Sequence, residues 1–160
     1  QVTAQQIEEM VAKLAARMEA NPADLKGWVM LGRSYKAMGR YEASAQAFSR
    51  AEALVNEDPH LLAEYAEALA FATGGSLKGR PSALIARALK LDPDHPEALI
   101  LAGTAAYERD DFAAAATYWE RLLKQLPADS EDAKMLSESI DKARKAAKKA
   151  GKPGRSSRGQ

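Results

Sequence analysis

The chain has 160 residues, a formal net charge of +1, no cysteine and an aromatic share of 6%. The absence of cysteine excludes disulfides and thiolate metal sites, and no apolar run approaches the roughly 20 residues that a helix needs to cross a bilayer. Abundant alanine and few β-branched residues favour helices packed on helices over a β-sheet. We therefore expect an all-α domain, either soluble as it stands or separated from an N-terminal membrane anchor.

Charge is distributed unevenly along the chain. Residues 1–141 carry 15 basic and 22 acidic side chains, whereas residues 142–160 carry 8 basic and no acidic ones. Because a highly charged segment without large apolar residues cannot bury a core, we expect a domain over residues 1–141 and a largely disordered basic tail over residues 142–160. The tail lacks aromatic side chains for stacking, and the acidic body would repel a polyanion, so we expect no nucleic-acid binding.

A first helix is predicted over residues 3–20 by apolar side chains at helical spacing, with Thr3 as its N-cap and Asn21-Pro22 as its end. Its apolar positions are Ile7, Met10, Val11, Leu14 and Met18. The segment resembles the second helix of a repeat whose first helix is missing. We expect it to cover the N-terminal end of a stack of helix pairs.

Residues 25–59 carry landmarks at the offsets of a tetratricopeptide (TPR) repeat, a helix–turn–helix unit of roughly 34 residues. The landmarks are Trp28, Leu31, Gly32 and Tyr35 in a first helix near residues 23–38, Gly39 in the turn, Phe48 and Ala51 in a second helix near residues 41–55, and Pro59 at the end. Gly32 and Ala51 are small where two helix backbones approach closely. One such hairpin cannot bury its apolar face alone, so we expect neighbouring repeats.

Two further repeats are predicted over residues 60–93 and 96–127. The second contains a longer turn over residues 74–81, which we expect to be a flexible insertion before a short helix over residues 81–91. In the third, Asp110-Asp111 should form a helix end and an N-cap. A last helix is expected over about residues 130–149. Its first half, residues 130–141, should pack as a C-terminal cap, and its second half, beyond Ile140, should fray into the tail. The predicted fold is a right-handed TPR solenoid of about three helix pairs, with an N-terminal half-repeat and a C-terminal capping helix.

Sequence patterns for catalysis or metal binding are missing. His60 and His95 lie beside prolines between repeats, and neither has a carboxylate spaced as a metal ligand or a catalytic triad requires. The glycines of the insertion do not form the phosphate-binding G-x-x-x-x-G-K-[ST] pattern. We therefore expect a protein that is not an enzyme and holds no metal or cofactor.

Binding is the function that stacked helix pairs favour, because the first helix of every pair lines a concave surface. The repeat offsets predict the groove residues: Lys26, Val29, Met30, Arg33 and Lys36 from the first repeat, Ala63, Glu64, Glu67, Ala70 and Phe71 from the second, and Ile100, Leu101, Thr104, Tyr107 and Glu108 from the third. Apolar side chains mixed with both signs of charge suit an amphipathic helix. In the alternative, Met30, Phe71 and Leu101 face neighbouring helices instead.

Residues 10–35, 61–70 and 88–123 resemble the C-terminal periplasmic domain of the cytochrome c-type biogenesis protein CcmI, also called CycH, and more distantly its nitrite-reductase counterpart NrfG. The resemblance covers nearly the whole chain except the basic tail. It implies a periplasmic chaperone that captures apocytochrome c through the cytochrome's C-terminal helix and hands it to the haem-ligation complex. It also implies a membrane-anchored part preceding Gln1.

No haem attachment motif is evident in the sequence, so we expect haem ligation to take place on a partner. The alternative function is that of a general adaptor, which binds another protein's helix or C-terminal peptide in the same groove. The proteins recovered from a periplasmic extract would distinguish the two.

Overall fold

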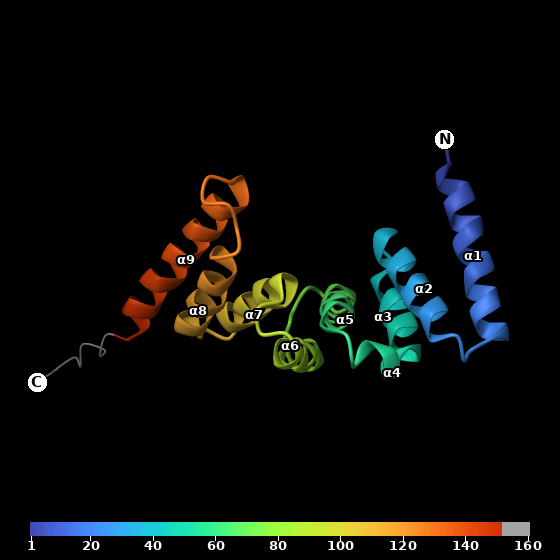
Figure 1. The fold of residues 1–160 in the computed structure, drawn as a ribbon, viewed down its shortest axis with the longest axis horizontal. Helices are drawn as coiled ribbons and strands as arrows, with labels where there is room; N and C mark the ends of the chain where they lie inside the picture. Colours follow the sequence, from blue (N-terminus) through green and yellow to red (C-terminus); the bar gives the residue numbers. More distant parts are fainter. Residues whose placement is uncertain (152–160) are drawn as a thin grey trace, which may run out of the picture.

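The computed structural model describes residues 1–151, and this part of the chain forms nine α-helices and no β-strand (Figure 1). The helices are α1 (Ala4–Ala20), α2 (Leu25–Ala37), α3 (Tyr41–Arg50), α4 (Glu52–Val55), α5 (Pro59–Ala72), α6 (Arg80–Leu91), α7 (Pro96–Glu108), α8 (Phe112–Leu123) and α9 (Glu131–Ala150). Residues 152–160 of the predicted tail lie outside the described residues. The all-α helical solenoid predicted from the repeats is confirmed.

The helices pack in pairs that stack in chain order. α2 packs on α3, α5 on α6 and α7 on α8, while α5 also contacts α3 and α7. α1 and α9 lie at the two ends of an elongated stack (Figure 1). Thr3 caps α1, as predicted. We term α2, α5 and α7 the first helices of the three pairs, because they hold the positions that should line the concave surface.

The turns of the first and third pairs share one backbone geometry. Gly39 and Asp110 follow α2 and α7 at equal spacing, with positive φ angles of 75° and 64°. Glycine adopts this left-handed conformation without a steric penalty, and aspartate tolerates it better than most residues. Asp111 then caps α8 by accepting a hydrogen bond from the Ala114 N–H at 3.2 Å. The helix end and N-cap predicted at Asp110-Asp111 are therefore confirmed.

The insertion in the second pair is anchored to the next repeat. Gly74, Gly75 and Gly79 have positive φ angles of 90°, 94° and 78°, which let the chain turn sharply. Leu77 between them is only 4% exposed, and its N–H donates to the Glu108 carboxylate at 3.0 Å. A buried apolar side chain and a charge-assisted hydrogen bond hold the loop in place, which corrects the expectation of a flexible insertion.

The second helix of the first pair is interrupted, although a continuous helix near residues 41–55 was predicted. Ala51 separates α3 from α4, and its N–H bonds to the Phe48 carbonyl at 3.0 Å, only three residues earlier. This tighter turn changes the direction of the chain, and α4 consequently contacts both α2 and α5. Ala51 itself is completely buried. A small side chain at this landmark fits the close approach that the repeat pattern predicts.

The C-terminal helix has nearly the predicted length. α9 ends at Ala150, close to the expected residue 149, but its second half stays helical beyond Ile140, so the expected fraying is wrong. Ala143 is fully buried in a cluster with side chains of α8, and Arg144 forms an ion pair with Glu120 of α8. Ala143 and Arg144 thus extend the packing of α9 past Ile140, the last large apolar side chain. A pattern of large apolar residues in the sequence does not indicate this packing.

α1 covers the N-terminal end of the stack only in part. Val11 and Met18 are buried, and Met18 fills the space next to Gly27 of α2. Ile7 and Met10, in contrast, are 43% and 63% exposed. From Val11 onwards α1 therefore buries apolar side chains in the stack, while its first two turns leave Ile7 and Met10 uncovered. The expectation that residues 3–20 cap the stack holds for one half of the helix.

Two glycines allow the helices of a pair to approach closely, as the repeat pattern predicts. A Cβ atom on Gly32 would lie 3.1 Å from the ring of Phe48, which is completely buried. A Cβ atom on Gly103 would overlap the indole of Trp119. Both helix pairs therefore require glycine, which has no side chain, at the same repeat position.

We predict that Gly103→Ala lowers the free energy of unfolding by about 1–3 kcal/mol, because the Trp119 indole must shift within a packed interface. Gly32→Ala should have a smaller effect, since a gain in helix propensity of up to ~1 kcal/mol offsets a slight movement of Phe48. Urea denaturation followed by circular dichroism measures both. A Gly103→Ala protein as stable as the unchanged chain would contradict the packing described.

Candidate protein-binding groove

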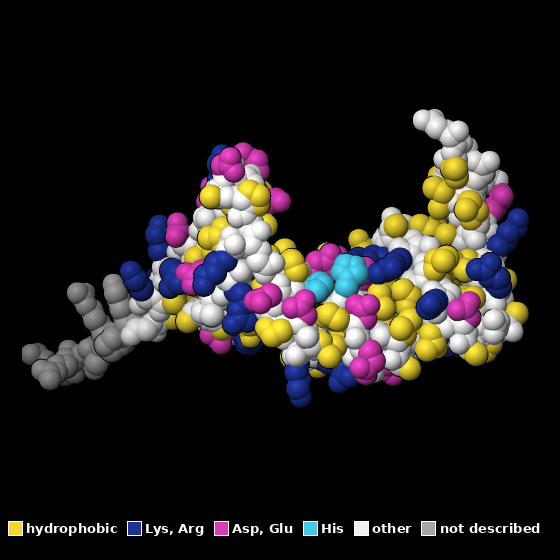
Figure 2. Space-filling view, viewed as in Figure 1, with side chains coloured by type: hydrophobic (Ala, Val, Ile, Leu, Met, Phe, Trp, Pro, Cys, Tyr) yellow, Lys and Arg dark blue, Asp and Glu magenta, His cyan; other side chains and the backbone are white. Residues whose placement is uncertain are grey.

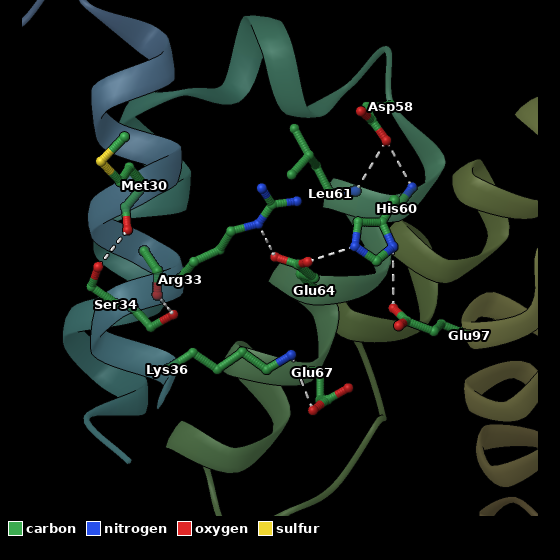
Figure 3. A network of polar contacts seen from close by, with 12 residues as sticks. Met30, Arg33, Ser34, Lys36, Asp58, His60, Leu61, Glu64, Glu67 and Glu97 are labelled. Atoms are coloured by element: carbon green, nitrogen blue, oxygen red, sulfur yellow. Dashed lines mark hydrogen bonds and ion pairs between the residues drawn. The ribbon is translucent and has the colours of Figure 1, made fainter. Parts of the chain in front are cut away.

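Polar side chains join the three first helices to one another. We term them the polar ladder: Arg33 and Lys36 on α2, His60, Glu64 and Glu67 on α5, and Glu97 on α7. Figure 3 shows these side chains reaching from one first helix to the next. In Figure 2 the two histidines lie near the middle of a hollowed side of the molecule, between acidic and basic side chains. The ladder therefore marks the floor of the candidate groove.

Glu64 is the centre of the polar ladder. Its side chain is 11% exposed, one carboxylate oxygen accepts a hydrogen bond from the Arg33 Nε at 2.9 Å, and the other lies 2.7 Å from the His60 Nε2. Two partners thus compensate a carboxylate that is largely removed from water. The hydrogen bond to Glu64 raises the pKa of the Arg33 guanidinium. Because only a strongly alkaline pH would remove the proton from Arg33, its guanidinium stays positively charged around neutral pH.

Two further contacts complete the polar ladder. The His60 Nδ1 lies 3.4 Å from the Glu97 carboxylate, and the Lys36 Nζ lies 3.2 Å from that of Glu67. An imidazole donates to two carboxylates only when both ring nitrogens carry hydrogen. The sequence analysis considered carboxylates near His60 only as metal or triad partners, and it missed these ion pairs. Glu64 lies four residues further on in α5, a spacing that places the two side chains on one helix face.

The predicted groove residues differ in exposure. Six of them are exposed: Lys26, Met30, Arg33, Phe71, Ile100 and Thr104. Five are partly buried: Lys36, Glu67, Leu101, Tyr107 and Glu108. Four are buried: Val29, Ala63, Glu64 and Ala70. The exposed side chains can meet a ligand without any change in the fold. The buried ones support the surface from beneath, through packing or through the polar ladder.

Three apolar side chains could have faced either a ligand or a neighbouring helix. Met30 is 55% exposed, so no helix within the described residues covers it. Phe71 is 51% exposed, yet its ring centroid lies 4.9 Å from that of Tyr41 at the start of α3. Leu101 is partly buried against the main core. Met30 is thus the freest of the three, and Leu101 is chiefly a packing residue.

Two other predicted groove residues hold the fold together. The Tyr107 ring packs edge-on against Phe112 at 4.9 Å and lies 6.0 Å from the Trp119 ring. The Glu108 carboxylate accepts the hydrogen bond from Leu77 that anchors the insertion. The repeat offsets do not indicate these contacts, because one comes from the inserted loop and the other from the hydrophobic cluster under α9. Substituting either residue would change packing as well as the surface.

Two hollows lie beside α2. One, of about 490 Å³, is lined by Lys26, Val29, Met30, Arg33, Ser34 and Ala37, four of which are predicted groove residues. The second, of about 880 Å³, lies between α1 and α2 and shares Met30, Ser34 and Ala37 with the first. Sequence reasoning missed the second hollow because it assigned α1 to cover the end of the stack. The apolar side chains at helical spacing in residues 3–20 were the available sign of it.

These features define a class of protein, a TPR-type helical repeat domain with a partly apolar surface along its first helices. Within residues 1–151, no group of three or more acidic, histidine or cysteine side chains is arranged to hold a metal ion. None of the helices described is both long and apolar enough to span a bilayer. The chain belongs to the family described as the cytochrome c-type biogenesis protein H TPR domain, whose sequence profile matches residues 1–133.

Individual relatives agree with this assignment. The chain is 37% identical over 145 residues to the cytochrome c-type biogenesis protein CycH of Pseudomonas aeruginosa, covering 91% of this chain and 36% of that protein. It is 29% identical over 140 residues to the cytochrome c-type biogenesis protein CcmH of Escherichia coli, covering 85% and 40%. A formate-dependent nitrite reductase complex subunit, NrfG of Escherichia coli, is 28% identical over 137 residues, covering 86% and 69%.

The resemblance to CcmI/CycH predicted from the sequence is thereby confirmed. The chain spans little more than a third of the length of CycH, so it corresponds to one part of such a protein.

We predict that Arg33 and Glu64 are coupled by about 1 kcal/mol in folding stability, because Glu64 is largely buried while solvent screens the half-exposed Arg33. A double-mutant cycle with Arg33→Gln and Glu64→Gln, followed by urea denaturation, measures this coupling. Arg50 and Glu19, 4.0 Å apart with mostly solvated side chains, form the control pair, and their coupling should stay below about 0.3 kcal/mol. Equal coupling energies in the two pairs would contradict the expectation that the polar ladder stabilises the fold more than a surface ion pair does.

Proposed function

We propose that this domain captures apocytochrome c during cytochrome c maturation, by binding the C-terminal helix of the cytochrome along the first helices, and presents it to the haem-ligation complex. The observation that carries this proposal is the exposure of Met30 and Ile100, at 55% and 46%, on α2 and α7 at either side of the polar ladder. Apolar side chains so placed gain free energy when a partner removes them from water.

The proposed occupant is an amphipathic helix. Such a helix presents apolar side chains at i, i+3 and i+4, which can reach exposed apolar side chains on successive first helices. Arg33 and Thr104 offer polar contacts beside them, since both are exposed. The charges of the ladder are already paired within the domain, so a ligand need not supply partners for them. Shape and apolar contact, more than charge at the centre, would then decide binding.

The names of the relatives support this assignment to cytochrome assembly. CycH and CcmH are described as cytochrome c-type biogenesis proteins, and NrfG as a subunit of a nitrite reductase complex. We propose that the domain is a periplasmic, non-catalytic binding module of a longer protein, attached to the membrane through an N-terminal part. Haem would be ligated on a partner, and neither a cofactor nor nucleic acid is required.

A segment of an unfolded cytochrome must become ordered when it binds, and this ordering consumes part of the interaction free energy. The binding should therefore be moderate and reversible. Reversibility suits a protein that holds its client only until the next component of the maturation complex takes it over.

We predict that a peptide with the sequence of a c-type cytochrome's C-terminal helix binds this domain in isothermal titration calorimetry, with a dissociation constant in the micromolar range. Ile100→Ser should weaken this binding about fivefold, because the serine cannot replace the lost apolar contact. Leu91→Ser is the matched control, since Leu91 is 44% exposed but ends α6, a second helix. It should leave the affinity unchanged.

If no such peptide binds, apocytochrome capture is refuted. Equal weakening by Ile100→Ser and Leu91→Ser would place the contact elsewhere than along the first helices. A scrambled peptide of the same composition, binding as well as the helical one, would favour a general adaptor for apolar segments.

A further inference from the structure

The hollow between α1 and α2 is the more apolar of the two hollows beside α2, and we term it the N-terminal trough. Ile7, Met10 and Leu14 line it from α1, and Met30, Ser34 and Ala37 line it from α2. Of the eight large apolar side chains that are exposed among residues 1–151, four line this trough: Val2, Ile7, Met10 and Met30. So much apolar surface in one concave place is typical of a docking site.

Comparing equivalent positions in the three repeats shows which packing partner is absent at the trough. Met30 occupies the position that Glu64 and Leu101 hold in the next two repeats. Glu64 is buried and bonded to α2, and Leu101 packs against the main core, whereas Met30 is 55% exposed. The difference arises because α5 and α7 each follow another first helix, while no first helix precedes α2 among the described residues. The trough thus lies where a further first helix would pack.

The dimensions of the trough agree with a helical occupant. Its lining runs from Val2, just before α1, to Arg17 within α1. A span of that many residues corresponds to about four helical turns, or roughly 20 Å. Ile7 and Met10, which line the trough from the N-terminal half of α1, are 43% and 63% exposed, so the trough is open along this half. A single amphipathic helix of about 15 residues would fill it.

The edge of the trough is positively charged, which favours helices that carry negative charge. Lys13 and Arg17, one turn apart on α1, line the trough, and no acidic residue does. Within residues 1–151, neither cation forms an ion pair with an acidic side chain. Lys26 continues the basic edge into the adjoining hollow on α2. We infer that the N-terminal trough docks an amphipathic helix of the captured protein whose apolar face is flanked by acidic side chains.

This inference rests on the proposed function, because the captured protein supplies the helix. A second copy of the chain is a poorer occupant. In a two-fold interface the same patch meets itself, so Lys13 and Arg17 of the two copies would face one another as like charges.

The test uses two designed peptides of about 15 residues with the same leucine face, one flanked by glutamate and the other by lysine. Fluorescence anisotropy should detect binding of the glutamate peptide only, with an affinity that falls as salt is raised. Lys13→Glu combined with Arg17→Glu should weaken it about tenfold or more. Lys90→Glu combined with Lys124→Glu is the control for net charge and should have little effect, since both lysines are exposed, Lys90 on α6 and Lys124 just after α8.

The apolar contribution is tested with Met10→Ser, which should weaken the glutamate peptide about fivefold. Met135→Ser, on α9, is the matched control because Met135 is 66% exposed and Met10 is 63% exposed. Equal binding of both peptides, or an unchanged affinity in the Lys13/Arg17 variant, would overturn the inference. So would a free chain that is dimeric by light scattering and becomes monomeric through Met10→Ser alone.

These outcomes are separable from those of the proposed function. A cytochrome peptide that binds the unchanged domain and the Lys13/Arg17 variant equally well would refute the trough while leaving apocytochrome capture intact. A glutamate peptide that binds in the trough, with no cytochrome peptide binding at all, would refute capture while leaving the trough as a docking site.

Discussion

The structure depends on one constraint, that a helix pair cannot bury its own apolar face and must be packed between neighbours. Inside the stack, α5 meets this requirement through contacts with α3, α6 and α7. The two ends differ. α9 buries Ile140 and Ala143 against the last pair, whereas α1 leaves Met10 in solvent. The apolar surface offered to a partner is therefore concentrated where the stacking is incomplete, at the N-terminal end.

The polar ladder gives the stack a second kind of connection. Arg33 and Lys36 reach from α2 to α5, and His60 reaches from α5 to α7. Because most of these charges have partners within the domain, the middle of the groove presents paired groups, while apolar and unpaired basic groups lie nearer α1. A helix bound along this surface would thus meet different chemistry at its two ends, which can fix its direction.

Much of the fold follows from the sequence, because the landmark residues are tied to a fixed geometry. Gly32 and Phe48 predict the close helix pair, and Gly39 predicts the turn. The departures come from contacts that a repeat pattern does not encode. Leu77 anchors an inserted loop through Glu108, and Ala143 extends the packing of α9 although it is small.

The groove was less predictable than the fold, for a related reason. Repeat offsets give the side of a helix on which a residue lies, but exposure depends on what packs there. Glu64 and Met30 share one repeat position, yet one is buried in an ion pair and the other is open to solvent. The trough depends on how α1 is oriented relative to α2, and no single residue in the sequence indicates this orientation.

The most direct test of the account is an NMR titration of the isotopically labelled domain with a peptide corresponding to a cytochrome's C-terminal helix. Binding along the first helices and in the N-terminal trough should shift the amide resonances of α1, α2, α5 and α7, and should leave those of the outer faces of α3, α6 and α8 unchanged. Shifts confined to α3, α6 and α8, or none at saturating peptide, would contradict it.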